Sequence, residues 1–261
     1  MNPDCKRIRQ DILKISNVSG HGHVPSCFSV IEILYALYHT INHDPKKPSW
    51  SRRDIFVLSK GHASLGLYCV LAHFGYFDIK NVYSFGSFTS DFGCHMDRIK
   101  IPGIEASTGS LGHGIAIAVG MALGLKIKKE DSRRVYTLIG DGEANEGSVW
   151  EAIMVATNLG LNNLTIIYDN NLSHSRGLQI QNPAQRLGAF GCEAVEVDGH
   201  DISQLKKEIL VVSSKPRAII AHTKKGFGSR SLISNHYEWH RKSPTSEELK
   251  KLLRELDEET V

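Results

Sequence analysis

The sequence predicts an α/β protein of three layers, in which a central, mostly parallel sheet lies between two layers of helices. Three observations support this fold class. Residues 135–139 and 164–168 are short, uninterrupted apolar runs, which are typical of buried strands. A strand, a helix and a strand in this order form a right-handed crossover between parallel strands, and such units build helix–sheet–helix layers. The segment between the two runs carries apolar side chains at helical spacing, at Val149, Ile153, Ala156 and Leu159.

The N-terminal part of the chain is predicted to contain two helices and one strand. Residues 4–18 place three isoleucines on one helix face, and helical apolar spacing resumes at residues 29–38. The Gly- and His-rich residues 19–23 separate these helices. Residues 54–58 form a short buried strand, and His62 follows its carboxyl end. Ligands bind at this edge of parallel sheets, so we expect His62 to point toward a binding site.

A long loop and a glycine-rich segment come next. Residues 82–98 are polar with scattered aromatic residues, and a loop of this length is usually functional or disordered. Residues 107–114 lead into a helix of small residues at 115–126, which could pack closely on the sheet. Residues 224–229 are predicted to be a mobile basic loop. The remaining elements are expected as helices at 184–190 and 202–212, strands at 193–197 and 217–221, and a closing helix that begins at the capping box of Thr245 and Glu248.

Length and composition indicate one ordinary globular domain. We expect a single domain over residues 1–261, with residues 225–261 as a loop and the closing helix. The net charge of +3 is too small to indicate nucleic acid or an anionic membrane as a partner, and no segment resembles a membrane span. The five cysteines form no CxxC pair, and the N-terminus lacks the apolar segment of a secretory signal. These features predict a reduced, cytoplasmic protein.

Polar groups are expected to meet at the carboxyl edge of the sheet. The crossover rule places Asp141 and Asn171 there, each just after a predicted strand. The Asp141 carboxylate, the Asn171 amide oxygen and the backbone carbonyl near Ser173 are the kinds of oxygen ligand that Mg²⁺ prefers, and Ca²⁺ or Mn²⁺ could take its place. Gly140 and Gly142 would let a diphosphate approach the backbone, and the following helix N-terminus favours an anion.

The order of motifs identifies a family resemblance. A Gly-Asp-Gly turn alone is weak, but here it is followed by Asn-Glu-Gly, a helix, and two asparagines thirty positions later, which resembles the thiamin-diphosphate-binding motif. Together with other segments in the same order, it is similar to the first third to half of a transketolase. The segments are SGH at 19–21, SKGHAS at 59–64, STGSLGHG at 107–114, GDGEANEG at 140–147, NN at 170–171 and WH at 239–240.

The resemblance implies the diphosphate-binding domain of a thiamin enzyme, with thiamin diphosphate and Mg²⁺ as cofactors. Asp141, Asn171 and the Ser173 carbonyl would be the metal ligands, and residues 109–111 would lie against the aminopyrimidine. The implied cofactor contacts are His62, Gly109, Ser110, Leu111, Gly140, Asp141, Gly142, Glu143 and Asn171. The implied catalytic residues are His21, His62, His95 and His240, as acid–base groups and hydrogen-bond donors in the substrate channel, and Glu146 and Glu151, as carboxylates that couple paired active sites across an interface.

The resemblance also implies a partner. A full-length transketolase continues into a pyrimidine-binding domain, whereas this sequence ends at Val261, just after the closing helix. We therefore expect the N-terminal subunit of a two-component transketolase, active only with a C-terminal subunit and assembled as α2β2. Such an enzyme transfers a two-carbon ketol unit from a ketose donor to an aldehyde or ketone acceptor, which are sugars or sugar phosphates, and the cofactor serves as the electron sink.

One segment departs from the family pattern. Around His95 the family usually has Gly-His-Pro, with an arginine four residues before the histidine, whereas this chain has Cys94, Met96 and Asp91. Replacing a cation by an anion at the channel mouth would disfavour a phosphate. This difference leads to the hypothesis of an unphosphorylated or nucleotide-linked acceptor.

Two other functions remain open. The α subunit of a thiamin-dependent 2-oxo-acid dehydrogenase also carries the Gly-Asp-Gly and Asn-Asn pattern, although the SKGHAS and WH segments argue against it. The second alternative is a catalytically silent binding module that regulates a partner. The intact Asp141, Asn171 and channel histidines argue against this function. A dehydrogenase of the Rossmann type is disfavoured because no G-x-G-x-x-G follows the first strand.

Overall fold

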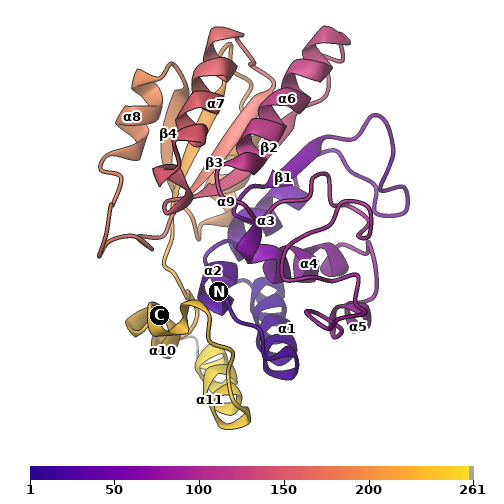
Figure 1. Ribbon diagram of the computed structural model, residues 1–261, viewed down its shortest axis with the longest axis vertical. Coiled ribbons are helices and arrows are strands. Elements are labelled where there is room, and N and C mark those ends of the chain that lie inside the picture. The colour runs from indigo at the N-terminus through magenta and orange to yellow at the C-terminus, as the bar shows by residue number, and fades with distance from the viewer. Residues whose placement is uncertain (259–261) are drawn as a thin grey trace.

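In residues 1–258, which the computed structural model describes, five parallel strands form one sheet (Figure 1). The order across the sheet is β1-β2-β3-β5-β4, and every neighbouring pair is parallel. The predicted α/β fold with a parallel sheet is confirmed. The strands are β1 (Ile55–Leu58), β2 (Val135–Gly140), β3 (Leu164–Asn170), β4 (Glu193–Asp198) and β5 (Arg217–His222).

Helices cover both faces of the sheet because strand side chains alternate in direction. On β2, Val135 and Ile139 enter the core on one face, whereas Tyr136 and Leu138 enter the core on the other. The first face is covered by α6 (His113–Ile127), α7 (Gly147–Asn158) and α8 (Pro183–Ala189). The core on the second face is built with α1 (Pro3–Ser19), α2 (Val24–Phe28), α3 (Ile31–Tyr38), α4 (Ser64–His73) and α9 (Ile202–Leu210), and α1 packs on α2, α3 and α4.

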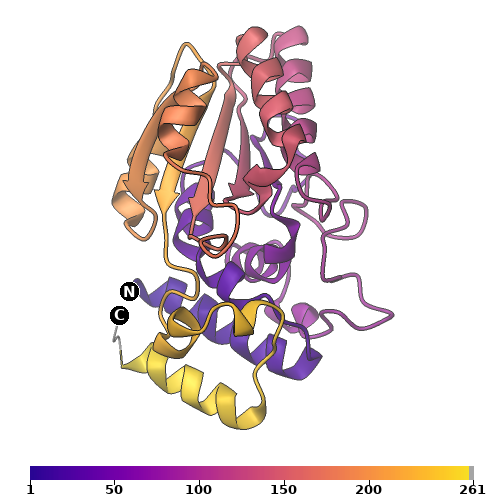
Figure 2. The ribbon, with the colours of Figure 1, turned by 60° about the vertical axis from the view of Figure 1, so that its left-hand side comes forward.

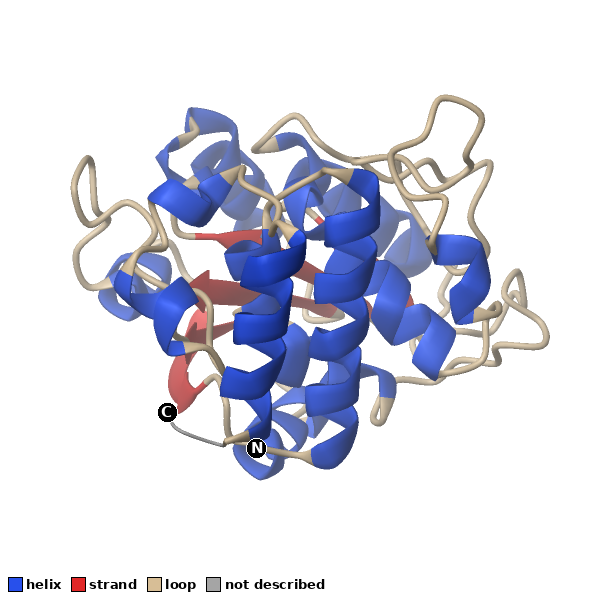
Figure 3. Cartoon of the chain, turned by 90° about the horizontal axis from the view of Figure 1, so that it is seen from below, coloured by secondary structure: helices blue, strands red, loops and turns tan. Residues whose placement is uncertain are grey.

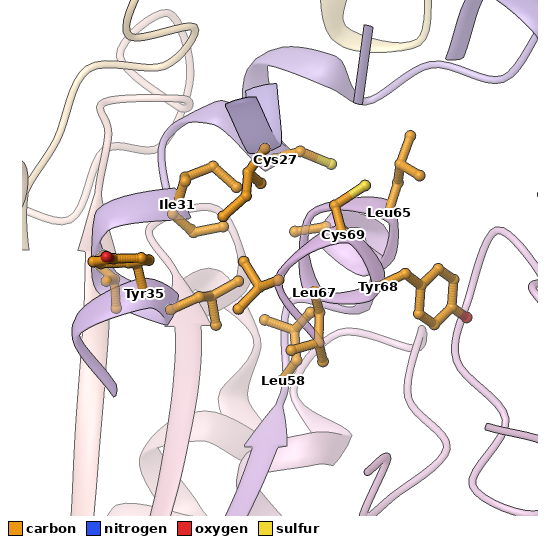
Figure 4. Packing of buried hydrophobic residues seen from close by; sticks show 14 of the residues in the cluster. Cys27, Ile31, Tyr35, Leu58, Leu65, Leu67, Tyr68 and Cys69 are labelled. Carbon is orange, nitrogen blue, oxygen red and sulfur yellow. The ribbon is translucent and has the colours of Figure 1, made fainter. Parts of the chain in front are cut away.

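The second core extends away from the sheet. Figure 4 shows Cys27 and Ile31 facing Leu67 and Cys69 of α4 above Leu58 of β1. α11 (Ser246–Asp257) lies beside α1, so the described ends of the chain are close together (Figures 2 and 3). The short elements are α5 (Ile79–Val82), α10 (Arg230–Ser234) and three 3₁₀ turns, Gly61–Ala63, Glu143–Asn145 and Glu238–His240.

No helix within residues 1–258 is long and apolar enough to cross a membrane. All five cysteines in this part of the chain are free, and four of them are buried. The helix predicted over residues 29–38 is observed as α3, which begins two residues later, at Ile31, and the short helix α2 before it was not predicted.

A buried ion pair ties α1 to α3. The Arg9 guanidinium donates to both Glu32 carboxylate oxygens, at 2.5 and 2.6 Å. It also lies over the rings of Phe28 and Phe227, at 5.5 and 5.2 Å from their centroids. Glu32 also interacts with Nδ1 of His200, at 3.0 Å. Burial alone would raise the pKa of Glu32, but the Arg9 charge and the hydrogen bonds from Arg9 and His200 hold it at about 2. The carboxylate is therefore ionised and contributes to stability above its unfolded pKa, and this contribution is lost as the pH falls toward 2.

Arg9→Ala should lower the free energy of unfolding by about 3–5 kcal/mol, because it leaves the Glu32 carboxylate buried without its counterion. Urea denaturation at neutral pH measures this loss. Lys6→Ala is the matched control, since Lys6 pairs with the exposed Asp257 at 3.0 Å and should cost less than about 1 kcal/mol. Equal, small losses in the two variants would contradict a structural role for the buried pair.

Candidate active site

A cavity of about 490 Å³ lies at the carboxyl ends of β1, β2 and β3. Segments that are distant in sequence line it, because parallel strands all end at this edge and each passes into a loop there. The lining residues fall within six segments, 20–26, 60–62, 85–111, 140–143, 171–174 and 240–241.

The three predicted metal ligands lie together in this wall. Asp141 is 2% exposed, and its carboxylate accepts the backbone N–H groups of Gly142 at 2.8 Å and His174 at 3.2 Å. The Asn171 side-chain oxygen accepts the N–H of Ser173 at 3.0 Å. Burial and the nearby Asp169 raise the pKa of Asp141. Within residues 1–258 no cluster of three His, Cys, Asp or Glu side chains could hold a metal, so a cation here would depend on amide and carbonyl oxygens as well, which suits Mg²⁺.

A buried carboxylate that sequence reasoning missed, Asp169, orients Asn171. Asp169 is completely buried at the end of β3 and forms an ion pair with Lys60 at 2.5 Å. It also accepts hydrogen bonds from Asn171 Nδ2 at 2.8 Å, from Ser29 at 2.8 Å and from Thr223. Because the amide nitrogen of Asn171 is bound to Asp169, its oxygen is directed to the Ser173 side.

Glu143, predicted to contact the cofactor, closes the wall of the cavity. Its carboxylate accepts the Ser59 hydroxyl at 2.5 Å and the N–H groups of Gly112 at 2.9 Å and Gly140 at 3.2 Å. These bonds join three segments of chain. Burial raises the pKa of Glu143.

The glycine-rich segments permit close backbone packing. A Cβ on Gly109 would lie 2.8 Å from the His95 ring, and a Cβ on Gly142 would lie 2.7 Å from the His174 ring. Gly109 and Leu111 line the cavity, whereas Ser110 is exposed outside it.

All four predicted channel histidines line the cavity, together with His23 and His174, which were not among the predicted catalytic residues. The ring centroid of His23 lies 5.5 Å from that of His62 and 5.3 Å from that of His240. Burial, followed by neighbouring positive groups, lowers the pKa of His23 and His240 to about 4 and that of His62 well below its usual range. These imidazoles are neutral at pH 7, so each can donate one hydrogen bond and accept another.

Lys225 was predicted in a mobile basic loop but is buried, at 4% exposure. Its ammonium donates to Ser173 Oγ at 2.6 Å and lies 3.1 Å from His240 Nδ1. Burial and the Lys60 charge lower the pKa of Lys225 to about 8. The sequence pattern of two adjacent lysines, Lys224 and Lys225, does not indicate which of them is buried.

Other predicted residues lie outside the cavity. Glu146 and Glu151 are exposed around the start of α7. Asp91 is exposed and does not line the cavity, although Cys94 and His95 from the same loop do. The placement of Asp91 at the channel mouth, on which the hypothesis of an unphosphorylated acceptor depends, is therefore not supported, and the cation Arg241 lines the cavity instead.

Comparison with known proteins agrees with this architecture. Residues 5–258 match the family model of the transketolase thiamine diphosphate binding domain. The chain is 38% identical to one of the subunits of the apulose-4-phosphate transketolase of Actinobacillus succinogenes, over 98% of this chain and 95% of that protein. It is 36% identical to the 6-deoxy-6-sulfo-D-fructose transketolase subunit SqwG of Clostridium sp., over 97% and 94% of the two chains.

Solved structures show the same fold. The transketolase of Campylobacter jejuni superposes with a TM-score of 0.89 at 31% identity, and the match covers 98% of this chain but 43% of that one. A transketolase variant from Pichia stipitis gives a TM-score of 0.88 at 28% identity, over 95% of this chain and 39% of that one. The chain thus spans about two fifths of these transketolases. It belongs to the transketolase family, in which it corresponds to the thiamine diphosphate-binding domain.

Proposed function

We propose that this chain is the diphosphate-binding subunit of a two-component transketolase, which transfers a two-carbon ketol unit from a ketose donor to an aldehyde or ketone acceptor. The convergence of Asp141, Asn171 and Ser173 beside an array of neutral histidines is the observation that carries this proposal. The near-complete coverage of two relatives named as subunits supports it. We also propose one domain over residues 1–261, with residues 225–261 as its closing segment.

The residues fit thiamin diphosphate with Mg²⁺, or with Ca²⁺ or Mn²⁺. Asp141, Asn171 and the Ser173 carbonyl would hold the cation, and Gly142 and Lys225 would face the diphosphate. When bound, the cofactor supplies the electron sink for cleavage of a carbon–carbon bond. Gly109 and Leu111 would support its aminopyrimidine ring, with Ser110 contributing through its backbone.

The histidines would handle protons and substrate hydroxyl groups. His62 and His240 are neutral, so each can donate a hydrogen bond to a hydroxyl group or accept its proton. His21 and His95 are more exposed at the cavity wall, where an incoming sugar would pass them.

The partner would be a C-terminal subunit that carries the pyrimidine-binding domain, in an α2β2 assembly. The exposed positions of Glu146 and Glu151 leave both carboxylates available for such an interface. The substrates would be sugars or sugar phosphates. The free cysteines within residues 1–258 fit a reducing, cytoplasmic location.

Thiamin diphosphate titrated with Mg²⁺ should bind weakly or not at all to this chain alone and tightly to its mixture with the C-terminal subunit, because each subunit would hold part of the cofactor. Isothermal titration calorimetry measures both affinities. Asp141→Asn should weaken the affinity of the mixture by about 100-fold or more, since even residues that only orient a metal ligand contribute about 10- to 100-fold. Asp131→Asn, at an exposed site far from the cavity, is the control. Tight binding by the chain alone would overturn the two-component proposal.

Lys225→Met should raise the dissociation constant of thiamin diphosphate by about tenfold, because it removes a buried ammonium beside Ser173. Lys224→Met removes the same charge from the adjacent, exposed position and should leave this constant unchanged. The same titration compares the two variants. A similar effect of both would mean that only the net charge of the segment matters.

Glu151→Lys should weaken the assembly of the two subunits, because it reverses a charge on the proposed interface face of α7. Sedimentation equilibrium measures the assembly. The fold should be unaffected, since Glu151 is exposed. Glu247→Lys on α11 is the matched control, and an unchanged assembly in Glu151→Lys would remove α7 from the interface.

A further inference from the structure

Arg241 is a cation of the cavity wall whose charge is not compensated. Lys60 and Arg241 are the lysine and arginine side chains that line the cavity within residues 1–258. Lys60 is neutralised by its ion pair with Asp169. In the same part of the chain, no carboxylate or hydrogen-bond acceptor lies within bonding distance of the Arg241 guanidinium. Its positive charge contributes to the low pKa of both His23 and His240.

The chain on both sides of Arg241 is anchored, so the side chain is presented from a fixed point. His240 contacts the Lys225 ammonium at 3.1 Å. Lys242 donates to Glu248 at 2.6 Å and lies over the Trp239 ring. A Cβ on Gly22 would lie 2.1 Å from the Arg241 carbonyl oxygen, so the two backbones are in direct contact. An unpaired guanidinium that projects from an anchored backbone at a cavity wall is suited to an oxyanion ligand.

The position of Arg241 favours an anion on the substrate over the cofactor diphosphate. The groups proposed to face the diphosphate lie at the ends of β2 and β3, where Lys225 donates to Ser173. Arg241 instead follows the 3₁₀ turn Glu238–His240, its backbone packs against Gly22, and its charge acts on His23. None of these segments belongs to a strand of the sheet or directly follows one.

We propose that Arg241 determines substrate selectivity by binding the oxyanion group, such as a phosphate, of the sugar acceptor. This inference rests on the proposed transketolase function. Asp91 stands where the family usually has an arginine, and the inference assigns the role of a phosphate-binding cation to Arg241 instead. An arginine suits this role because its planar guanidinium can donate two parallel hydrogen bonds to one oxyanion.

The test uses the enzyme assembled with its C-terminal subunit, with L-erythrulose as an uncharged donor and D-glyceraldehyde 3-phosphate or D-glyceraldehyde as the acceptor. Arg241→Gln should lower the ratio of kcat/KM for the phosphorylated over the unphosphorylated acceptor by about tenfold, mainly through KM, as expected for one exposed charge-assisted contact. Arg241→Lys should retain part of the preference. Inorganic phosphate should inhibit the Arg241→Gln enzyme less than the wild type.

Arg98→Gln is the matched control, because Arg98 is exposed near His95 but does not line the cavity. It should leave the ratio of kcat/KM for the two acceptors unchanged.

The inference would be overturned if Arg241→Gln left this ratio unchanged or lowered kcat/KM equally for both acceptors. Transfer by the wild-type enzyme would still uphold the proposed function in that case. A raised dissociation constant for thiamin diphosphate would also overturn the inference, by assigning Arg241 to the cofactor. Failure of the wild type to transfer to either acceptor would instead reject the proposed function, and the inference with it.

Discussion

The candidate site depends on one buried carboxylate, that of Asp169. Withdrawing this charge from water is costly, and the cost is offset because Lys60 lies 2.5 Å away and Ser29, Asn171 and Thr223 donate hydrogen bonds. These partners come from four separate segments of the chain. The end of β3 is thereby held against the loop after β1 and against the C-terminal end of α2. Asn171 is oriented as part of the same network, so its oxygen is in place before any ligand binds.

The parallel sheet explains why so many polar groups meet at one edge. The central strands β2 and β3 are buried along their whole length, and the polar groups of the cavity follow the strands: Lys60 comes after β1, Asp141 after β2 and Asn171 after β3. Glu143 connects a second set of loops, because its carboxylate accepts hydrogen bonds from Ser59, Gly112 and Gly140. The wall of the cavity is thus built from hydrogen bonds between loops, whereas the two apolar cores hold the layers of helices to the sheet.

The histidines of the cavity take their properties from burial and from nearby cations. His23, His62 and His240 each lose solvent, and the charges of Lys60 and Lys225 further disfavour their protonation. The low pKa keeps all three imidazoles neutral at pH 7, so each can donate one hydrogen bond and accept another within the cavity.

The parallel α/β fold, the positions of the five strands and the placement of Asp141 and Asn171 at one edge could all be predicted from the sequence. These features follow from local patterns, namely apolar runs, helical spacing and the crossover rule. The burial of individual charged side chains and their pairing with opposite charges could not be predicted in this way. The inward turn of Lys225, the pairing of Lys60 with Asp169, the exposure of Asp91 and the unpaired Arg241 depend on contacts between segments distant in the chain. A local pattern carries no information about such contacts, because burial and ion pairing are set by the three-dimensional neighbours of a side chain.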